Sequence, residues 1–471
     1  MSDLNELLTA IDNSVALEGT TVKVRDAARL RANIDKLVEF SALRPGEIQG
    51  WARYIVRGAA LDLGIVPASI NDLYLARGRG DVPVTFTTPA LNLRVLSYQS
   101  ARAVFRIAKK MNGAAFIFEI ARSEIGYTAQ RPAEYATNVL AAAIAEDWTG
   151  PVFIQGDHFQ VSAKKYAADA QGETNAVKDL AREAIAAGFF NIDIDTSTLV
   201  DISRPTVPEQ QETNFGLSSE IAAFIRGIEP KDVTISIGAE IGEVGGHNST
   251  EEELRAFMEG FDAGMKKRAP GKTGLSKISI QTGTSHGGTV LPDGTLAKVS
   301  IDFDTLRELS RVARKDYGLG GTVQHGASTL PEDAFHKFVE NEAIEVHLAT
   351  GFMTMFYETI PADLRQQMYV WLDKNSAAER KPDMTDEQFY YKARKNALGP
   401  FKSQIYGLPA SQKDKIDAAW HSQFEKLFNL LGVKDTRQYV DKFVKPVRVA
   451  PDMKSYLGKE VSEAMADDLQ D

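Results

Sequence analysis

Residues that can bind a metal or move a proton follow several apolar runs of this sequence. In VFIQGDHFQ, Asp157 and His158 come directly after a stretch of β-branched and aromatic residues. His286 and His325 end the runs KISIQTGTSH and GTVQH, and His347 lies within AIEVHLAT. One such histidine is more often a hydrogen-bonded structural residue, but four of the chain's seven histidines share this placement. A catalytic zinc ion can be held by three imidazoles that leave a fourth coordination position open for water or substrate. We therefore hypothesise a zinc site formed by these histidines.

Carboxylates end two further apolar runs. These residues, from FFNIDID and GAEIGEVGG, are Asp193, Asp195, Glu240 and Glu243. The remaining histidines lie in an expected loop and in helical patterns: His247, His336 and His421.

Glycine follows two of the strand-end histidines. TGTSHGG places Gly287 after His286, and HGAS places Gly326 and Ser328 after His325. Either glycine alone could be a simple turn, but glycine also lets backbone amides approach a ligand closely. Loops after the later strands of a barrel are a recurrent phosphate site, and Ser328 adds a hydroxyl donor. The two motifs together favour phosphate binding.

The overall composition limits the kinds of partner and of metal site. The chain has 471 residues, no cysteine, a net charge of −10 and a pI near 5.4. Without cysteine, any metal must be held by histidine and carboxylate, and disulfides and cysteine nucleophiles are excluded. The negative charge argues against nucleic acid or an anionic membrane as a partner. Because no apolar run is long enough to span a membrane and the start lacks a signal-peptide layout, we expect a cytoplasmic protein.

Eight strand-like runs, each followed by a helix-like one, fill the middle of the chain. The runs are ALNLRV, AAFIFEI, VFIQGDH, FFNIDID, VTISIGAEIG, KISIQTG, GTVQHGAS and AIEVHLAT. This alternation is typical of parallel strands joined by crossover helices and predicts a (β/α)8 TIM barrel. An open doubly wound sheet is the alternative, but no glycine-rich dinucleotide fingerprint follows the first strand. In a barrel, the residues named above would meet at the carboxyl ends of the strands.

The flanking segments differ from this core. We place the barrel at residues 88–358, between a helical N-terminal extension, 1–87, and a helical C-terminal extension, 359–471. The first contains DAARLRANIDKLVEF, and the second contains DLRQQMYVWLDKN and AAWHSQFEKLFNLLG, all with helical periodicity. We expect these extensions to cover the barrel or to form the contacts of a homo-oligomer.

The ordered motifs of the barrel segment resemble those of class II, metal-dependent fructose-bisphosphate and tagatose-bisphosphate aldolases. The motifs are GDH at 156–158, EIGEVGG at 240–246, GTSHG at 283–287, HGAS at 325–328 and EVHLAT at 345–350. They occur in the family order, and the set of five is specific although no single motif is decisive.

The resemblance implies roles for individual residues. His158, His286 and His325 match the three histidines that bind the catalytic zinc ion. Asp157 matches the general acid/base that acts on the hydroxyl at the bond being broken. Neighbours on a strand point to opposite sides, so Asp157 and His158 can share one site only where the strand ends and turns. The other matches are Asp195 and Glu240, which would orient metal ligands or hold a second divalent or a monovalent cation, and the substrate or phosphate contacts Gly287, Gly326, Ser328, Ser123 and Thr350.

The sequence departs from the family pattern at several positions. After the paired glycines of the fifth β/α unit, the family has an acidic pair, one member of which moves the proton on the enediolate carbon. This chain has GGHNSTEEE there, so His247, Glu243 or Glu251 would have to perform that step. The lysine usual after the sixth-strand HG is absent, and Lys298 is the nearest replacement. His347 stands where the family has asparagine, and the chain is longer than typical members.

These observations predict a zinc-dependent class II aldolase whose substrate is a phosphorylated ketose, with reversible cleavage of fructose 1,6-bisphosphate as the first choice. Tagatose 1,6-bisphosphate or another ketose phosphate is the alternative substrate. The non-catalytic partner subunit of tagatose-bisphosphate aldolase is a rival interpretation, although it lacks the two later HG motifs. A metal-dependent barrel hydrolase or epimerase is an alternative from another functional class. A two-metal hydrolase would normally show an early H-x-H pair, and none occurs in this sequence. A Schiff-base aldolase would need a lysine at the end of a strand, and none is evident in the eight strand-like runs.

Overall fold

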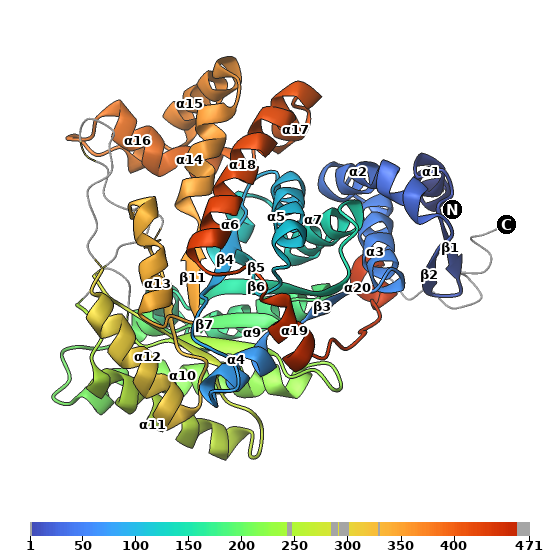
Figure 1. Cartoon of the computed structure of the whole chain (residues 1–471). Helices are drawn as coiled ribbons and strands as arrows, with labels where there is room; N and C mark the ends of the chain where they lie inside the picture. The colour runs from blue at the N-terminus through green and yellow to red at the C-terminus, as the bar shows by residue number, and fades with distance from the viewer. Residues whose placement is uncertain (1, 243–246, 284–290, 292–300, 328–329, 459–471) are drawn as a thin grey trace.

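The computed structural model shows eight parallel strands closed into a barrel (Figure 1). It describes residues 2–242, 247–283, 291, 301–327 and 330–458. The barrel strands are β4 (Thr88–Asn92), β5 (Ile117–Ala121), β6 (Gly150–Gln160), β7 (Asn191–Asp195), β8 (Ser236–Glu240), β9 (Lys277–Ile280), β10 (Thr322–Gln324) and β11 (Glu345–Leu348). Pairing of β11 with β4 and of β6 with β7 closes the cylinder. The predicted (β/α)8 barrel is confirmed.

Helices follow the barrel strands. They are α5 (Ser97–Met111), α6 (Arg122–Tyr127), α7 (Pro132–Ala145), α8 (Ala163–Ala168), α9 (Ala170–Ala187), α10 (Val207–Ile228), α11 (Glu251–Arg268), α12 (Phe303–Tyr317), α13 (His336–Glu340) and α14 (Thr350–Thr359), with short 3-10 turns η1 (Ser197–Leu199) and η3 (Glu332–Ala334). Local sequence sets their ends. Thr206 and Thr250 form capping boxes at the starts of α10 and α11, and Gly318 ends α12 with a φ of 69°.

Polar and apolar residues alternate along several barrel strands. In β7, Ile192 and Ile194 alternate with Asp193, and all three are buried. Lys277 of β9 contacts both Asp193 of β7 and Glu345 of β11. Because successive side chains of a strand point to opposite faces, the polar set lies inside the barrel and the isoleucines lie under the helices.

The N-terminal extension contains strands as well as the expected helices. Its elements are α1 (Ser2–Ala10), β1 (Val15–Glu18), β2 (Thr21–Val24), α2 (Ala27–Leu43), α3 (Glu47–Asp62), β3 (Ile65–Ala68) and α4 (Asn71–Gly78). β1 and β2 form an antiparallel hairpin, and Gly19 in its turn has a φ of 60°. The purely helical expectation is corrected here, because β-branched residues on both sides of a glycine turn favour a hairpin.

β3 joins the N-terminal extension to the barrel. It pairs with the segment 150–153 of β6, whereas β7 pairs with the segment 155–160. Asn191 fixes this junction: its Nδ2 donates to the carbonyls of Ala68 at 3.1 Å and Ile154 at 3.0 Å, and its Oδ1 accepts from the amide of Ile70 at 2.9 Å. The extension therefore forms part of the barrel floor.

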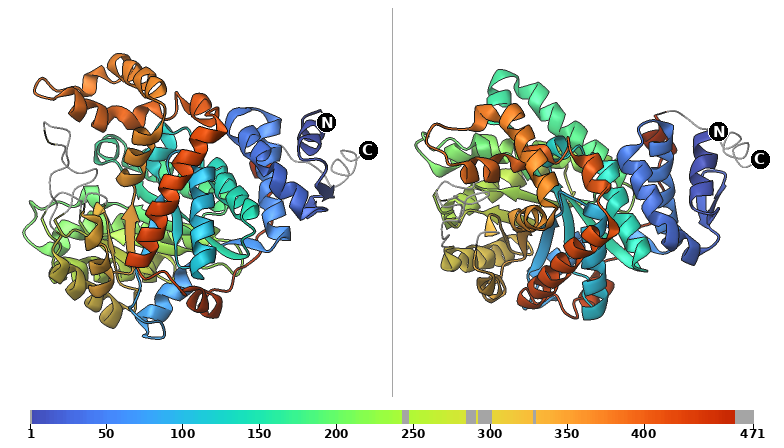
Figure 2. Two further views of the ribbon diagram at one scale, coloured as in Figure 1. Left: turned by 45° about the horizontal axis from the view of Figure 1, so that its top comes forward. Right: turned by 90° about the horizontal axis from the view of Figure 1, so that it is seen from above.

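The C-terminal extension is helical. It contains α15 (Ala362–Asn375), η4 (Ala377–Glu379), α16 (Asp386–Ala393), η5 (Arg394–Ala397), α17 (Lys402–Tyr406), α18 (Ala410–Leu430), α19 (Arg437–Phe443) and α20 (Met453–Leu457). α18 packs against α5 and α14, and α20 packs against α3. In both views of Figure 2, the blue N-terminal helices and the orange C-terminal helices lie over different parts of the molecule. Among the described residues, no helix is both long and apolar enough to cross a membrane.

Candidate active site at the carboxyl ends of the strands

A cavity of about 980 Å³ opens where β5, β6, β10 and β11 end. Asp157 and His158 of β6, His325 after β10 and His347 of β11 line it together. Helices α6, α8 and α14 and the C-terminal segments α16 and η5 supply much of the remaining described wall. Residues from distant parts of the sequence therefore meet at the rim where barrel enzymes carry their active sites.

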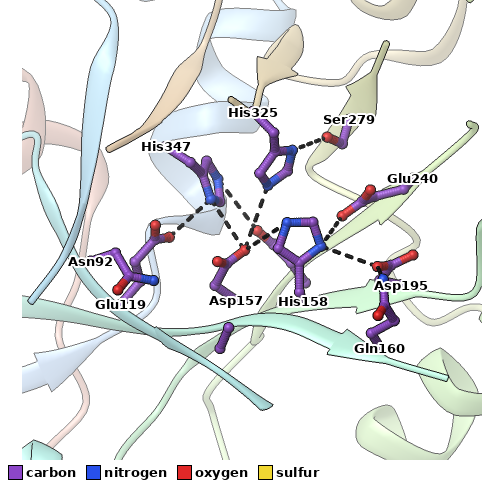
Figure 3. Close-up of polar contacts among 12 residues, drawn as sticks. Asn92, Glu119, Asp157, His158, Gln160, Asp195, Glu240, Ser279, His325 and His347 are labelled. Carbon is purple, nitrogen blue, oxygen red and sulfur yellow. Dashed lines mark hydrogen bonds and ion pairs between the residues drawn. The ribbon is translucent and has the colours of Figure 1, made fainter. Parts of the chain in front are cut away.

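Asp157 lies between two histidines (Figure 3). Its Oδ1 is 3.8 Å from His158 Nε2 and 3.5 Å from His325 Nε2. The two imidazole rings have centroids 4.3 Å apart, and each of the three residues offers a ligand atom within 4.8 Å of the others. Although burial opposes its ionisation, the neighbouring His158 and His347 hold the pKa of Asp157 well below its usual range.

Other side chains hold the second nitrogen of each of these rings. His158 Nδ1 is 2.7 Å from Glu240 Oε1 and 3.1 Å from Asp195 Oδ2. His325 Nδ1 is 2.7 Å from Ser279 Oγ. A ring fixed at Nδ1 presents Nε2 to a metal. Burial lowers the pKa of His325, whereas at His158 burial is outweighed by Asp157 and Glu240, which raise its pKa, so metal binding there must displace a proton. The donor set therefore fits a zinc ion.

Asp195 and Glu240, expected near the metal, contact His158 from one side (Figure 3). Ser197 Oγ donates to Asp195 Oδ1 at 2.7 Å, and Gln160 Nε2 donates to its Oδ2 at 2.5 Å. Burial and the nearby Asp195 raise the pKa of Glu240 to about 7. The two carboxylates and His158 also form a candidate cation-binding group of their own, with ligand atoms within 4.8 Å.

His347 contacts carboxylates with both of its ring nitrogens. Its Nδ1 is 3.0 Å from Glu119 Oε2 and 3.2 Å from Asp157 Oδ1, and its Nε2 is 2.7 Å from Glu345 Oε1. Burial raises the pKa of Glu119 to about 7. His347 thus joins the cavity to the barrel interior.

A buried ion network continues below His347. Lys277 Nζ is 2.5 Å from Glu345 Oε1, 2.9 Å from Asp193 Oδ2 and 2.7 Å from Gln155 Oε1. Burial raises the pKa of Asp193 to about 6, and burial opposes the charge of Lys277, yet Asp193 and Glu345 raise the pKa of this lysine. All four side chains are at most 5% exposed. The network thus holds the side chains that lie directly below the cavity in place.

Sequence reasoning did not single out Glu119, Lys277 or Glu345. Each is the charged residue of a short apolar strand, in FIFEI, KISI and EVHL. A parallel strand is buried on both faces, so a charged residue within such a strand must have a buried partner. This is the signal by which these residues could have been found.

The structure places three of the predicted substrate contacts, Ser123, Gly326 and Thr350, in the cavity wall. Five residues considered from the sequence lie outside the described residues: Glu243, His286, Gly287, Lys298 and Ser328. His247 Nε2 lies 2.7 Å from Glu253 Oε1 in α11, and Glu251 pairs with Arg255. Neither His247 nor Glu251 is among the described residues that line the cavity.

Fold and site together define a (β/α)8 barrel with histidines and carboxylates at metal-ligand spacing at the carboxyl ends of its strands. Residues 85–405 match the model of the family described as Fructose-bisphosphate aldolase class-II. The chain belongs to this family, which confirms the resemblance seen in the motifs. Its members are metal-dependent aldolases.

Several solved structures are similar to this chain at low sequence identity. A fructuronate-tagaturonate epimerase from Cohnella laeviribosi is 12% identical, with a TM-score of 0.52 and 90% of each chain covered. A protein from Sinorhizobium meliloti 1021 described as a "probable tagatose 6 phosphate kinase" is 15% identical, with a TM-score of 0.51, covering 82% of this chain and 98% of that one. A fructose-bisphosphate aldolase from Campylobacter jejuni is 17% identical, with a TM-score of 0.46, covering 79% of this chain and 97% of that one.

Proposed function

We propose that this chain is a zinc-dependent aldolase that cleaves fructose 1,6-bisphosphate reversibly into dihydroxyacetone phosphate and glyceraldehyde 3-phosphate. The position of Asp157 carries the proposal: its Oδ1 lies within 3.8 Å of the Nε2 atoms of both His158 and His325. The residue that matches the family's general acid/base thus stands beside two residues that match its metal ligands.

His158 and His325 would hold the zinc ion, together with His286, which lies outside the described residues. A bound zinc ion acts as a Lewis acid that stabilises negative charge on a substrate oxygen. The Asp157 carboxylate beside these ligands can accept the proton of the substrate hydroxyl in cleavage and return it in condensation. Glu240 would keep His158 in the orientation that metal binding needs.

Backbone groups on the β10 and β11 side of the cavity would bind a substrate phosphate. Gly326 has a φ of 69°, a conformation that favours glycine and lets the chain come close to a ligand. Thr350 begins α14, and the amino end of a helix attracts phosphate. Gly326 and Thr350 support dihydroxyacetone phosphate as the half of the substrate held nearest to the metal site, and Ser123, near the start of α6, adds a hydroxyl on the β5 side of the cavity.

The test is cleavage of fructose 1,6-bisphosphate, followed by coupled detection of triose phosphate, before chelation, after chelation and with zinc restored. We expect activity that disappears with the chelator and returns with zinc. No cleavage by a zinc-containing sample would contradict fructose 1,6-bisphosphate as the substrate; tagatose 1,6-bisphosphate would then be assayed in the same way. Failure with both sugars would favour the partner-subunit interpretation.

Asp157→Asn gives the matched variant for this assay. It keeps the size of the side chain but removes the base, so turnover should fall by about 10²-fold or more while zinc content, measured by atomic absorption, stays at the wild-type level. Loss of zinc from this variant would instead assign Asp157 to the coordination sphere.

A further inference from the structure

The C-terminal extension contributes part of the cavity wall. Its residues there are Met384, Gln388, Tyr391, Lys392 and Lys395, from α16, η5 and the segment before them. η5 also packs against α6, the helix that follows β5. The extension therefore reaches over the β5 side of the cavity, where it can contact whatever the barrel residues bind.

Three lysines lie in this wall, and none of them is within ion-pair distance of an acid among the described residues, although Lys165 is near enough to Glu173 to help lower the pKa of that carboxylate. Lys392 and Lys395 come from the extension, and Lys165 comes from α8. The two arginines of the wall differ, because Arg94 pairs with Glu124 at 2.6 Å and Arg122 with Glu173 at 2.6 Å. The lysines thus leave positive charge at the mouth of a cavity in a chain whose net charge is −10.

The acids of the described cavity wall do not balance this charge. They are Glu119, Glu124 and Asp157. Glu119 contacts His347, Glu124 contacts Arg94, and Asp157 contacts both His158 and His347. An anion entering the cavity would therefore meet lysines whose charge no acid of the described wall compensates.

The two lysines of the extension lie on the same side of the cavity. They are three residues apart in a helical stretch, so both project from the same face. Lys395 Nζ also lies 5.8 Å from the ring centroid of Tyr127 in α6, which places its ammonium group over the β5 side. Lys165 follows β6, and four steps around the eight-stranded barrel separate β6 from β10. Lys395 and Lys165 are therefore held beside the β5 and β6 units and not by the β10 unit, which carries Gly326.

We propose that Lys392 and Lys395 of the C-terminal extension form a second anion subsite, which binds the charged group at the far end of the substrate. The proposal rests on the proposed function, since it assumes a ketose phosphate held by its first phosphate near Gly326. Its ligand class is a phosphorylated ketose that carries a second anionic group, either a phosphate ester or a carboxylate. The extension is thus a determinant of substrate specificity in this chain.

The test compares the wild-type extension with the double variant K392Q/K395Q by calorimetric titration, each in the full-length, zinc-loaded chain that also carries Asp157→Asn, so that the bisphosphate is bound but not appreciably cleaved. The ligands are fructose 1,6-bisphosphate, the corresponding 1-phosphate, and a hexulose 1-phosphate with a carboxylate at carbon 6. We expect the Kd of the doubly anionic ligands to rise about tenfold or more and that of the 1-phosphate to change less than about twofold. The doubly anionic ligand that the wild-type extension binds more tightly identifies the natural far-end group.

The matched control is K374Q/K381Q, which removes two exposed charges from the same extension at positions outside the described cavity wall. Its affinities should equal those of the wild-type extension. Equal losses for the 1-phosphate and the bisphosphate, or unchanged affinity for both doubly anionic ligands, would overturn the subsite. Because binding is measured in the Asp157→Asn background, binding of the bisphosphate through these lysines together with no cleavage of it by the wild type would refute the proposed reaction and leave the subsite standing.

Discussion

Asp157 and His158 are consecutive residues, yet both face the cavity because β6 leaves regular strand geometry between them. His158 has a φ of 39°, and the pairing with β7 shifts register between Gly156 and Phe159. A non-glycine residue in the left-handed region costs about 1–3 kcal/mol, so the surrounding contacts must hold it there. The strand does not end at the histidine, as the sequence suggested, but continues to Gln160 after this bulge.

His347, which stands where the family has asparagine, contacts both Asp157 and Glu345. His347→Ala removes the contacts to Asp157 Oδ1 at 3.2 Å and to Glu345 Oε1 at 2.7 Å. We expect kcat to fall by about 10- to 100-fold with little change in KM, because Asp157 loses a neighbour that positions it. Steady-state kinetics checks this split, and His336→Ala, an exposed histidine in α13, is the control. Undiminished kcat in the His347 variant would show that Asp157 needs no such support.

Asp62, at the end of α3, holds the N-terminal hairpin of β1 and β2 to that helix. Its carboxylate accepts from the Val24 amide at 2.9 Å and from Lys23 Nζ at 3.1 Å. Burial works in the opposite direction, but the Val24 amide and Lys23 lower the pKa of Asp62 below its ordinary value. A carboxylate with a lowered folded-state pKa stabilises the protein above its unfolded pKa, and this stabilisation is lost as pH falls through the folded-state pKa.

Asp62→Asn should therefore lower the free energy of unfolding by about 1 kcal/mol at pH 7. The difference between the variant and the wild type should shrink as pH falls below about 4, where the wild-type carboxylate takes up its proton. Urea unfolding of both proteins at a series of pH values measures this difference. A difference that is independent of pH would mean that the charge of Asp62 has no part in holding the hairpin.

The sequence predicted the barrel strands well but not the strands of the N-terminal extension. Each barrel strand is a distinct apolar run followed by a helical pattern, so periodicity alone located it. β3 is only four residues long, and its strand character depends on pairing with β6, a partner far away in the sequence. The site was predictable where a motif marks it, as at Asp157, His158 and His325. Lys277 and Glu345 could not be paired in advance, because their contact depends on how strands face one another across the closed barrel.

Glu134 of α7 connects both the N-terminal and the C-terminal extension to the barrel. Its Oε2 lies 3.3 Å from Arg53 of α3, and its Oε1 lies 2.5 Å from Lys402 of α17. The side chains of Glu134, Arg53 and Lys402 are 3%, 14% and 13% exposed, so water screens these pairs poorly.

Glu134→Gln should reduce the free energy of unfolding by about 3 kcal/mol, because it leaves two largely buried cations without their anion. Glu183→Gln removes an exposed partner of Arg131 and should cost less than about 1 kcal/mol. Urea unfolding followed by circular dichroism compares the two variants. Similar costs for both would show that Glu134 does not join the extensions to the barrel.

Closure of the barrel also decides when the site comes into existence. The pairing of β4 with β11 places Ala90 beside His347, which are far apart along the chain. Contacts between such distant segments form late in folding, since the entropy of a long loop must be overcome first. His158, His325 and His347 come from three different β/α units, so no partly folded fragment holds the full donor set. Metal uptake during refolding would therefore mark the moment at which the cylinder is complete.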